Sequence, residues 1–146
     1  MRTSPSDSQF RERVRQSFSR QVLMSYIGAT LQSVEPGEVA IALKPSVNLT
    51  QQHGYLHAGV VTSIVDSACG YAAYTLMPAE ADVVSVEFKV NMLAPAVGDS
   101  FIARGRVIRA GKTLTVCQGD VYASSAAGER HVAMMVATMM RVARAE

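Results

Sequence analysis

The sequence predicts an α+β protein in which a curved antiparallel sheet wraps around one long central helix, with an extra helix at the N-terminus. Three observations predict this arrangement. Residues 57–79 are nearly uncharged, and at about 100° per residue their apolar side chains cover an arc of about 180°, which is typical of a buried helix. Residues 84–142 contain strand-like segments joined by short turns, which favours antiparallel pairing. A helix with so wide an apolar face needs the concave side of a curved sheet to cover it.

Turn signals between periodic segments divide the chain into elements. The predicted elements are a helix over residues 10–24, strands over 27–34 and 38–43, a long helix beginning near 58, and strands over 84–92, 101–109, 112–123 and 131–142. The first helix is predicted from apolar residues at helical spacing between Phe10 and Leu23. We interpret the mixed charges of residues 11–15 as its solvated face. Pro36-Gly37 predicts a hairpin between the first two strands.

The later elements are predicted from alternation and turn chemistry. Residues 44–55 form a polar loop that leads into the long helix. Residues 84–92 alternate apolar and polar side chains, which predicts a strand with one buried and one polar face. Ala110-Gly111 is expected at the centre of a tight hairpin, and residues 126–129 form another turn. The last strand carries four methionines, which we interpret as adaptable core packing.

Length and composition restrict the class of protein. The 146 residues are enough for a single domain, and a net charge of +2 without clustered Lys and Arg argues against a nucleic-acid surface. Cys69 and Cys117 lack paired spacing and indicate buried thiols in a reducing compartment. The polar N-terminus and the polar stripe of the long helix argue against a signal peptide or a membrane span. We therefore expect a cytoplasmic protein with no metal site.

Asp66 is the first candidate catalytic residue. It is the single acid in an apolar helical segment, where it lies among glycines and hydroxyl side chains, and no Lys or Arg occurs between Thr50 and Phe88. A carboxylate in such a place costs free energy unless something pairs with it or uses it. A structural role and a catalytic role are both compatible with this pattern, because perturbed carboxylates occur in both settings.

Three segments together resemble the hotdog-fold acyl-CoA thioesterases, and more narrowly the PaaI-like, phenylacetate-pathway type of the 4-hydroxybenzoyl-CoA thioesterase superfamily. They are QQHGYLHAGVVTSIVDSACG at 51–70, VSVEFKVNMLAP at 84–95 and RAGKT at 109–113. The most specific feature is His-x-Gly followed by an acid nine residues after the His. The resemblance implies a hotdog domain over residues 25–146, preceded by a tail and helix over 1–24, that hydrolyses an acyl- or aryl-CoA to free acid and CoA.

The resemblance also implies roles for individual residues. Asp66 would be the general base for water or the nucleophile on the thioester. Ala58 and Gly59 begin the helix, where backbone N–H groups lack partners, and the amide matching Ala58 would hold the thioester oxygen. Gln51 would orient the carbonyl or water, or would instead bond its own loop. His57 is expected to be a helix cap or a loop-bonding residue rather than the base.

Further positions would contact the substrate. Ser85 would support the water or the acyl group, although a solvent-facing strand serine is the alternative. The turn at 109–113 resembles the turn that meets coenzyme A in this family, and its candidate ligands are Arg109, Gly111, Lys112 and Thr113. The resemblance implies a homodimer, assembling to a homotetramer, in which the loop of one subunit faces the acid of the other.

Two other functions are compatible with the same fold. One is a non-catalytic module that binds or senses acyl-CoA, and the other is an enoyl-CoA hydratase or dehydratase, for which the sequence carries no signature. No cofactor is expected beyond the coenzyme A of the substrate itself. Composition does not indicate which acyl group is bound, because this depends on pocket volume.

Overall fold

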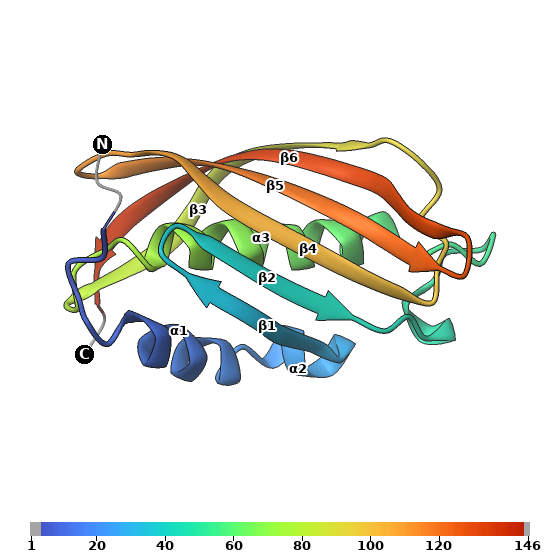
Figure 1. Cartoon of the computed structure of the whole chain (residues 1–146), viewed down its shortest axis with the longest axis horizontal. Coiled ribbons are helices and arrows are strands. Elements are labelled where there is room, and N and C mark those ends of the chain that lie inside the picture. The colour runs from blue at the N-terminus through green and yellow to red at the C-terminus, as the bar shows by residue number, and fades with distance from the viewer. Residues whose placement is uncertain (1–3, 145–146) are drawn as a thin grey trace.

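The computed structural model describes residues 4–144 and confirms the predicted fold class (Figure 1). In chain order its elements are α1 (Phe10–Ser19), α2 (Val22–Ile27), β1 (Ala29–Glu35), β2 (Glu38–Leu43), the 3-10 turn η1 (Val47–Leu49), α3 (Ala58–Tyr74), β3 (Ala81–Met92), β4 (Ser100–Ala110), β5 (Leu114–Ser125) and β6 (Gly128–Ala143). The strands form one antiparallel sheet in the order β1-β2-β4-β5-β6-β3. Figure 1 shows this sheet curving around α3, with α1 and α2 along the β1 side. Residues 1–3 of the predicted tail lie outside the described part.

Helix α3 packs very closely against the middle of the sheet. Gly105 of β4 and Gly119 of β5 are directly paired beneath it. A Cβ atom at Gly105 would lie 2.3 Å from the carbonyl carbon of Ala68, and one at Gly119 would lie 2.4 Å from Cγ2 of Val65. Ala68 and Val65 are fully buried. The two glycines therefore let the helix approach the strands, and this contact fixes the distance between α3 and the sheet.

The N-terminal segment corrects the prediction of one helix over residues 10–24. The chain forms two helices because Gln21 is extended, with φ −80° and ψ 96°, and α2 ends at Gly28 in the left-handed conformation with φ 77°. The first strand consequently begins at Ala29 instead of residue 27. The break is stabilised by hydrogen bonds between the Gln21 side chain and α3, described below. Helical spacing in the sequence does not indicate these contacts.

Arg13 corrects the interpretation of the first charged run as a purely solvated face. Its guanidinium is buried, donates hydrogen bonds to the carbonyl oxygens of Tyr74, Met77 and Pro78, and lies 4.1 Å from the centre of the Tyr74 ring. Asp7 is 2.9 Å from its Nε. A cation is favourable at this place because the carbonyls at the end of a helix lack partners and carry partial negative charge. Arg13 therefore anchors α1 to the end of α3.

Strand β3 corrects the prediction of one continuous buried face over residues 84–92. A bulge between Ser85 and Glu87 shifts the register, so Ser85 lies on the same face as Phe88 and Met92. Helix α3 covers that face only in part, because β3 is at the sheet edge and both Phe88 and Met92 are 44% exposed. The apolar alternation of this strand thus indicates a surface that the single chain leaves open.

The remaining strands follow the prediction with small shifts at the ends. The reversal between β4 and β5 is centred beyond Ala110, because Gly111 donates its N–H to the carbonyl of Leu114, where β5 begins. Of the four methionines of β6, Met135 and Met139 are buried in the core, and Met134 and Met140 lie on the opposite face of the strand. No helix among residues 4–144 is long and apolar enough to cross a bilayer.

Candidate functional site

Asp66 lies at the middle of α3, on the side that faces β3. Its Oδ1 accepts a hydrogen bond of 2.7 Å from the hydroxyl of Ser85, and the carboxylate is half-buried. Burial raises the pKa of Asp66, and the hydrogen bond from Ser85 lowers it by a smaller amount. Within the described residues, none of the ion pairs involves Asp66. A carboxylate with a raised pKa and no counter-ion can accept a proton from water or attack an electrophile.

A cavity of about 450 Å³ opens beside this carboxylate. Its lining includes residues that the sequence argument did not select, namely Ser17, Arg20, Gln21, Tyr71 and Asp82. Three of them, Ser17, Arg20 and Gln21, come from α1 and its junction with α2, which no motif in the sequence connects to the site. The volume falls within the range of about 300–1,000 Å³ that is usual for small-molecule sites. The structure thus places a ligand-sized space next to Asp66 and Ser85.

The start of α3 contains a free backbone donor. His57 is the N-cap, and its Nδ1 accepts the N–H of Gly59 at 2.8 Å, which confirms the prediction of a capping role. The N–H of His57 is bonded to the carbonyl of Leu49. Among the hydrogen bonds of residues 4–144, none uses the N–H of Ala58, which is exposed. The amide of Ala58 is therefore available to an external oxygen, and that of Gly59 is occupied.

The acid and this amide are far apart within one chain. Ala58 and Asp66 are separated by eight residues of the same helix, and a rise of about 1.5 Å per residue places them roughly 12 Å apart. A base or nucleophile and an oxyanion donor must both lie within about 3 Å of the reacting group. The two groups of a single chain cannot act on the same carbonyl.

Gln51 lies in the loop before α3 and not in the cavity beside Asp66. Its Oε1 accepts hydrogen bonds from the backbone N–H groups of His53 at 2.5 Å and Tyr55 at 3.3 Å. Within a single chain the side chain therefore bonds its own loop, which was the alternative interpretation of this residue. Its Nε2 group donates to no side chain or backbone among the described residues, so it is free to meet a group from outside the chain.

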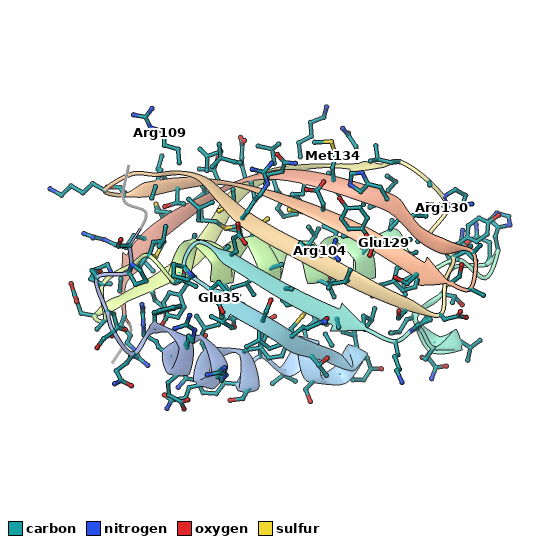
Figure 2. All side chains as sticks on the ribbon, in the orientation of Figure 1. Glu35, Arg104, Arg109, Glu129, Arg130 and Met134 are labelled. Carbon is teal, nitrogen blue, oxygen red and sulfur yellow. The ribbon has the colours of Figure 1, made fainter. Side chains whose placement is uncertain are left out.

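The turn between β4 and β5 separates the predicted coenzyme A ligands. Gly111 and Lys112 line a cavity of about 270 Å³ at the end of α3, together with Arg141 of β6. Thr113 is hydrogen-bonded to β6, because its backbone carbonyl accepts the N–H of Arg141. Figure 2 shows Arg109 projecting away from the body of the sheet, so it does not join them. No signal in the sequence points to Arg141, since only strand pairing brings it near the turn.

Comparison with known proteins shows the family to which this chain belongs. Residues 53–128, which contain the start of α3, Asp66, Ser85 and the β4–β5 turn, match the family model of the thioesterase superfamily. The chain belongs to the thioesterase superfamily. This thioesterase is 34% identical over 109 residues to a Saccharolobus solfataricus protein assigned as an esterase, covering 75% of this chain and 72% of that protein. It is 32% identical over 95 residues to human acyl-coenzyme A thioesterase 13, covering 63% and 66%.

Solved structures show the same hotdog fold. A thioesterase family protein from Silicibacter pomeroyi superposes with a TM-score of 0.91 and 47% identity, over 92% of this chain and 99% of that one. The Escherichia coli PaaI protein superposes with a TM-score of 0.81 and 18% identity, over 92% and 94%, which is a likeness of fold. The protein is thus a hotdog-fold thioesterase, a hydrolase of thioester bonds, as the sequence motifs predict.

Proposed function

We propose that this thioesterase hydrolyses acyl-CoA thioesters to the free acid and coenzyme A, with Asp66 as the acid of the site. The observation that carries the proposal is the half-buried carboxylate of Asp66, which has no counter-ion and borders a ligand-sized cavity. Its relatives include human acyl-coenzyme A thioesterase 13, which is named for the activity proposed here.

The proposed site is shared between two copies of the chain. Asp66 comes from one copy, and the free N–H of Ala58 comes from the partner, since roughly 12 Å separates these groups along one helix. The Ala58 amide and the positive end of the helix dipole would stabilise the oxyanion that forms on the thioester carbonyl. The free amide group of Gln51, in the same loop, would orient the carbonyl or the water.

The chemistry is a hydrolysis with two possible first steps. As a general base, Asp66 takes a proton from water while the water oxygen bonds to the carbonyl carbon. The C–S bond then breaks, and the proton passes to the thiolate of coenzyme A. As a nucleophile, Asp66 first bonds to the carbonyl carbon, and the C–S bond breaks to release the thiolate of coenzyme A and leave a mixed anhydride. Water then opens the anhydride to the free acid and the Asp66 carboxylate, and its proton passes to the thiolate. A single turnover in H₂¹⁸O distinguishes the two, because only the anhydride route can leave ¹⁸O in the Asp66 side chain.

The proposed homodimer forms at the open edge of β3. Phe88 and Met92 are both 44% exposed on the face that also carries Ser85, and an unpaired strand edge with apolar side chains favours association. We expect Phe88→Glu to give a monomer in sedimentation experiments, with a native circular dichroism spectrum and no activity. A Phe88→Glu variant that stays dimeric contradicts this interface.

The proposed homotetramer uses the outer face of the sheet. Leu114, Met140 and Val84 are paired side by side across β5, β6 and β3. Leu114 is 49% and Val84 is 42% exposed. Leu114→Glu should therefore reduce a tetramer to dimers that keep their activity, whereas Phe88→Glu should abolish activity. A tetramer that survives Leu114→Glu excludes this face.

Coenzyme A would be bound by the basic cavity at the end of α3. Lys112 and Arg141 both line it, and cationic side chains stabilise phosphate groups. Lys112→Ala should raise KM for an acyl-CoA but leave hydrolysis of the matching acyl-N-acetylcysteamine unchanged, because the latter has no phosphates. Arg109→Ala should have a smaller effect, since Arg109 projects elsewhere. Equal effects on both substrates would contradict phosphate binding.

A cytoplasmic location is also proposed, supported by the two free cysteines.

The decisive experiment measures thiol release from a panel of acyl-CoA substrates. Asp66→Asn should lower kcat by about 10²–10⁴-fold, as expected for loss of a general base. Asp99→Asn, an exposed acid outside the Asp66 cavity, is the matched control and should retain the full rate. Full activity of Asp66→Asn refutes the assignment. Binding of acyl-CoA without thiol release would instead indicate a sensing module, and loss of enoyl absorbance would indicate a hydratase.

A further inference from the structure

The cavity beside Asp66 fits an acyl group better than a nucleotide. Its charged lining consists of Asp66 and Asp82 with one cation, Arg20, so a polyphosphate would meet more negative than positive charge. The basic cavity with Lys112 and Arg141 lies elsewhere, at the end of α3. On the proposed function, the Asp66 cavity is therefore the place for the part of the substrate on the acyl side of the thioester.

One wall of this acyl cavity is formed by Gln21, at the break between α1 and α2. Its Nε2 donates to the hydroxyl of Tyr71 at 3.1 Å, and its Oε1 accepts from the hydroxyl of Ser67 at 3.0 Å. Ser67 directly follows Asp66 on α3, and Tyr71 is one turn further along. Ser17 of α1 bonds the same Tyr71 hydroxyl at 3.2 Å. The amide of Gln21 is thus held in one orientation next to the catalytic acid.

The hydrogen-bonding capacity of Gln21 is not exhausted by these contacts. A side-chain amide has two N–H donors, and within residues 4–144 the Nε2 group makes a hydrogen bond to Tyr71 alone. Gly70, which also lines the cavity, has no side chain that could fill the space, and a Cβ atom built there would meet nothing within 4 Å. Gln21 therefore lines the cavity with one N–H donor that has no partner among residues 4–144.

We propose that Gln21 determines the acyl specificity of this thioesterase by donating a hydrogen bond to an oxygen atom on the acyl group of the substrate. The substrates it favours carry a hydroxyl, ether or keto oxygen away from the thioester, in preference to unsubstituted chains or rings of the same size. An unsubstituted acyl group would cover the polar wall of Gln21, Ser67 and Tyr71 without replacing its hydrogen bonds to water, which is unfavourable. Gln21 lies outside residues 53–128, so this specificity belongs to the N-terminal segment and not to the region matched by the family model.

The test compares kcat/KM for two matched pairs of substrates. They are hexanoyl-CoA with 6-hydroxyhexanoyl-CoA, and benzoyl-CoA with 4-hydroxybenzoyl-CoA. The unsubstituted protein should prefer the oxygenated member of at least one pair by about tenfold, the effect of one well-made hydrogen bond in a partly buried site. Gln21→Leu should reduce that ratio to about one, mainly by slowing the oxygenated substrate. Gln16→Leu, an exposed glutamine of α1 that bonds Glu12, is the control and should keep the ratio.

A second variant separates specificity from folding. Gln21→Glu keeps an oxygen that can accept from Ser67 but removes the N–H donors, so it should also lose the preference, even if Gln21→Leu is unstable. No preference in the unsubstituted protein, or an equal loss for all four substrates in both variants, overturns the inference but leaves the thioesterase assignment intact. Failure of the unsubstituted protein to release thiol from any acyl-CoA overturns the proposed function, and the inference with it.

Discussion

Mixing two inactive variants tests whether each site is built from two copies of the chain. Asp66→Asn removes the acid, and Ala58→Pro removes the backbone N–H proposed as the oxyanion donor. Proline is well tolerated at Ala58, because this is the first residue of α3 and that position favours proline. The preceding His57 has φ −60° and ψ 137°, the extended conformation that a residue before proline requires.

The expected magnitude follows from the separation of the two groups. Each variant alone should lose about 10²-fold or more of kcat, because it lacks either the acid or an oxyanion donor. When equal amounts are unfolded together and refolded, half of the dimers contain one copy of each. In a mixed dimer one site carries both changes, and the other combines an intact Asp66 with an intact Ala58. The mixture should therefore recover about one quarter of the unsubstituted activity, as random assortment in a symmetric dimer requires.

The control is Ala58→Gly, which shortens the same side chain and keeps the N–H. It should be active alone, and its mixture with Asp66→Asn should show about half of the unsubstituted activity, as simple dilution gives. A mixture of Asp66→Asn with Ala58→Pro that stays as inactive as its parents refutes the shared site. Full activity of Ala58→Pro alone removes this amide from the mechanism.

Three further outcomes are expected from the local structure. Ser85→Ala removes the hydrogen bond that lowers the pKa of Asp66, so the acid limb of the kcat/KM profile should move to higher pH, and a limb moved to lower pH contradicts the assignment. Because burial raises the folded-state pKa of Asp66, its charge costs stability at neutral pH. Asp66→Asn should therefore raise the melting temperature at pH 7, and this gain should fade as the pH falls through the raised pKa of Asp66. A lower melting temperature at pH 7 would contradict the cost assigned to the buried charge. Gly105→Ala should lower the free energy of unfolding by about 1–3 kcal/mol in guanidinium chloride, because its Cβ would meet the Ala68 backbone. Gly70→Ala should not lower this free energy, because a Cβ atom there meets nothing within 4 Å.

The central helix and its acid could be predicted because their signals are local. The apolar arc of α3 and the absence of any base near Asp66 are both visible in one stretch of sequence, and His57 occupies the cap position that its spacing indicates. Alternation in β3 also predicts a strand. It does not reveal the bulge after Ser85, which places this serine on the face of Phe88 and toward Asp66.

The N-terminal part of the site could not be predicted because its contacts are distant in sequence. Gln21 bonds Tyr71 and Ser67, which follow it by 50 and 46 residues, and its backbone departs from the helix to do so. Arg13 likewise bonds carbonyls more than 60 residues away. Helical spacing describes which face of a segment is apolar, but it contains no information on polar side chains that meet across the fold.

The rigidity of α3 makes assembly part of the proposed catalytic machinery. Because Ala58 and Asp66 lie on the same helix, the helix rise sets their separation, and no movement of α3 within one chain can close it. A second copy is then the remaining source of an amide near the acid. The exposed Phe88 is unfavourable for an isolated chain, yet it lies on the face of β3 that carries Ser85, the partner of Asp66. Burial of that face against another copy would therefore remove apolar surface from water and complete the environment of the carboxylate in the same step.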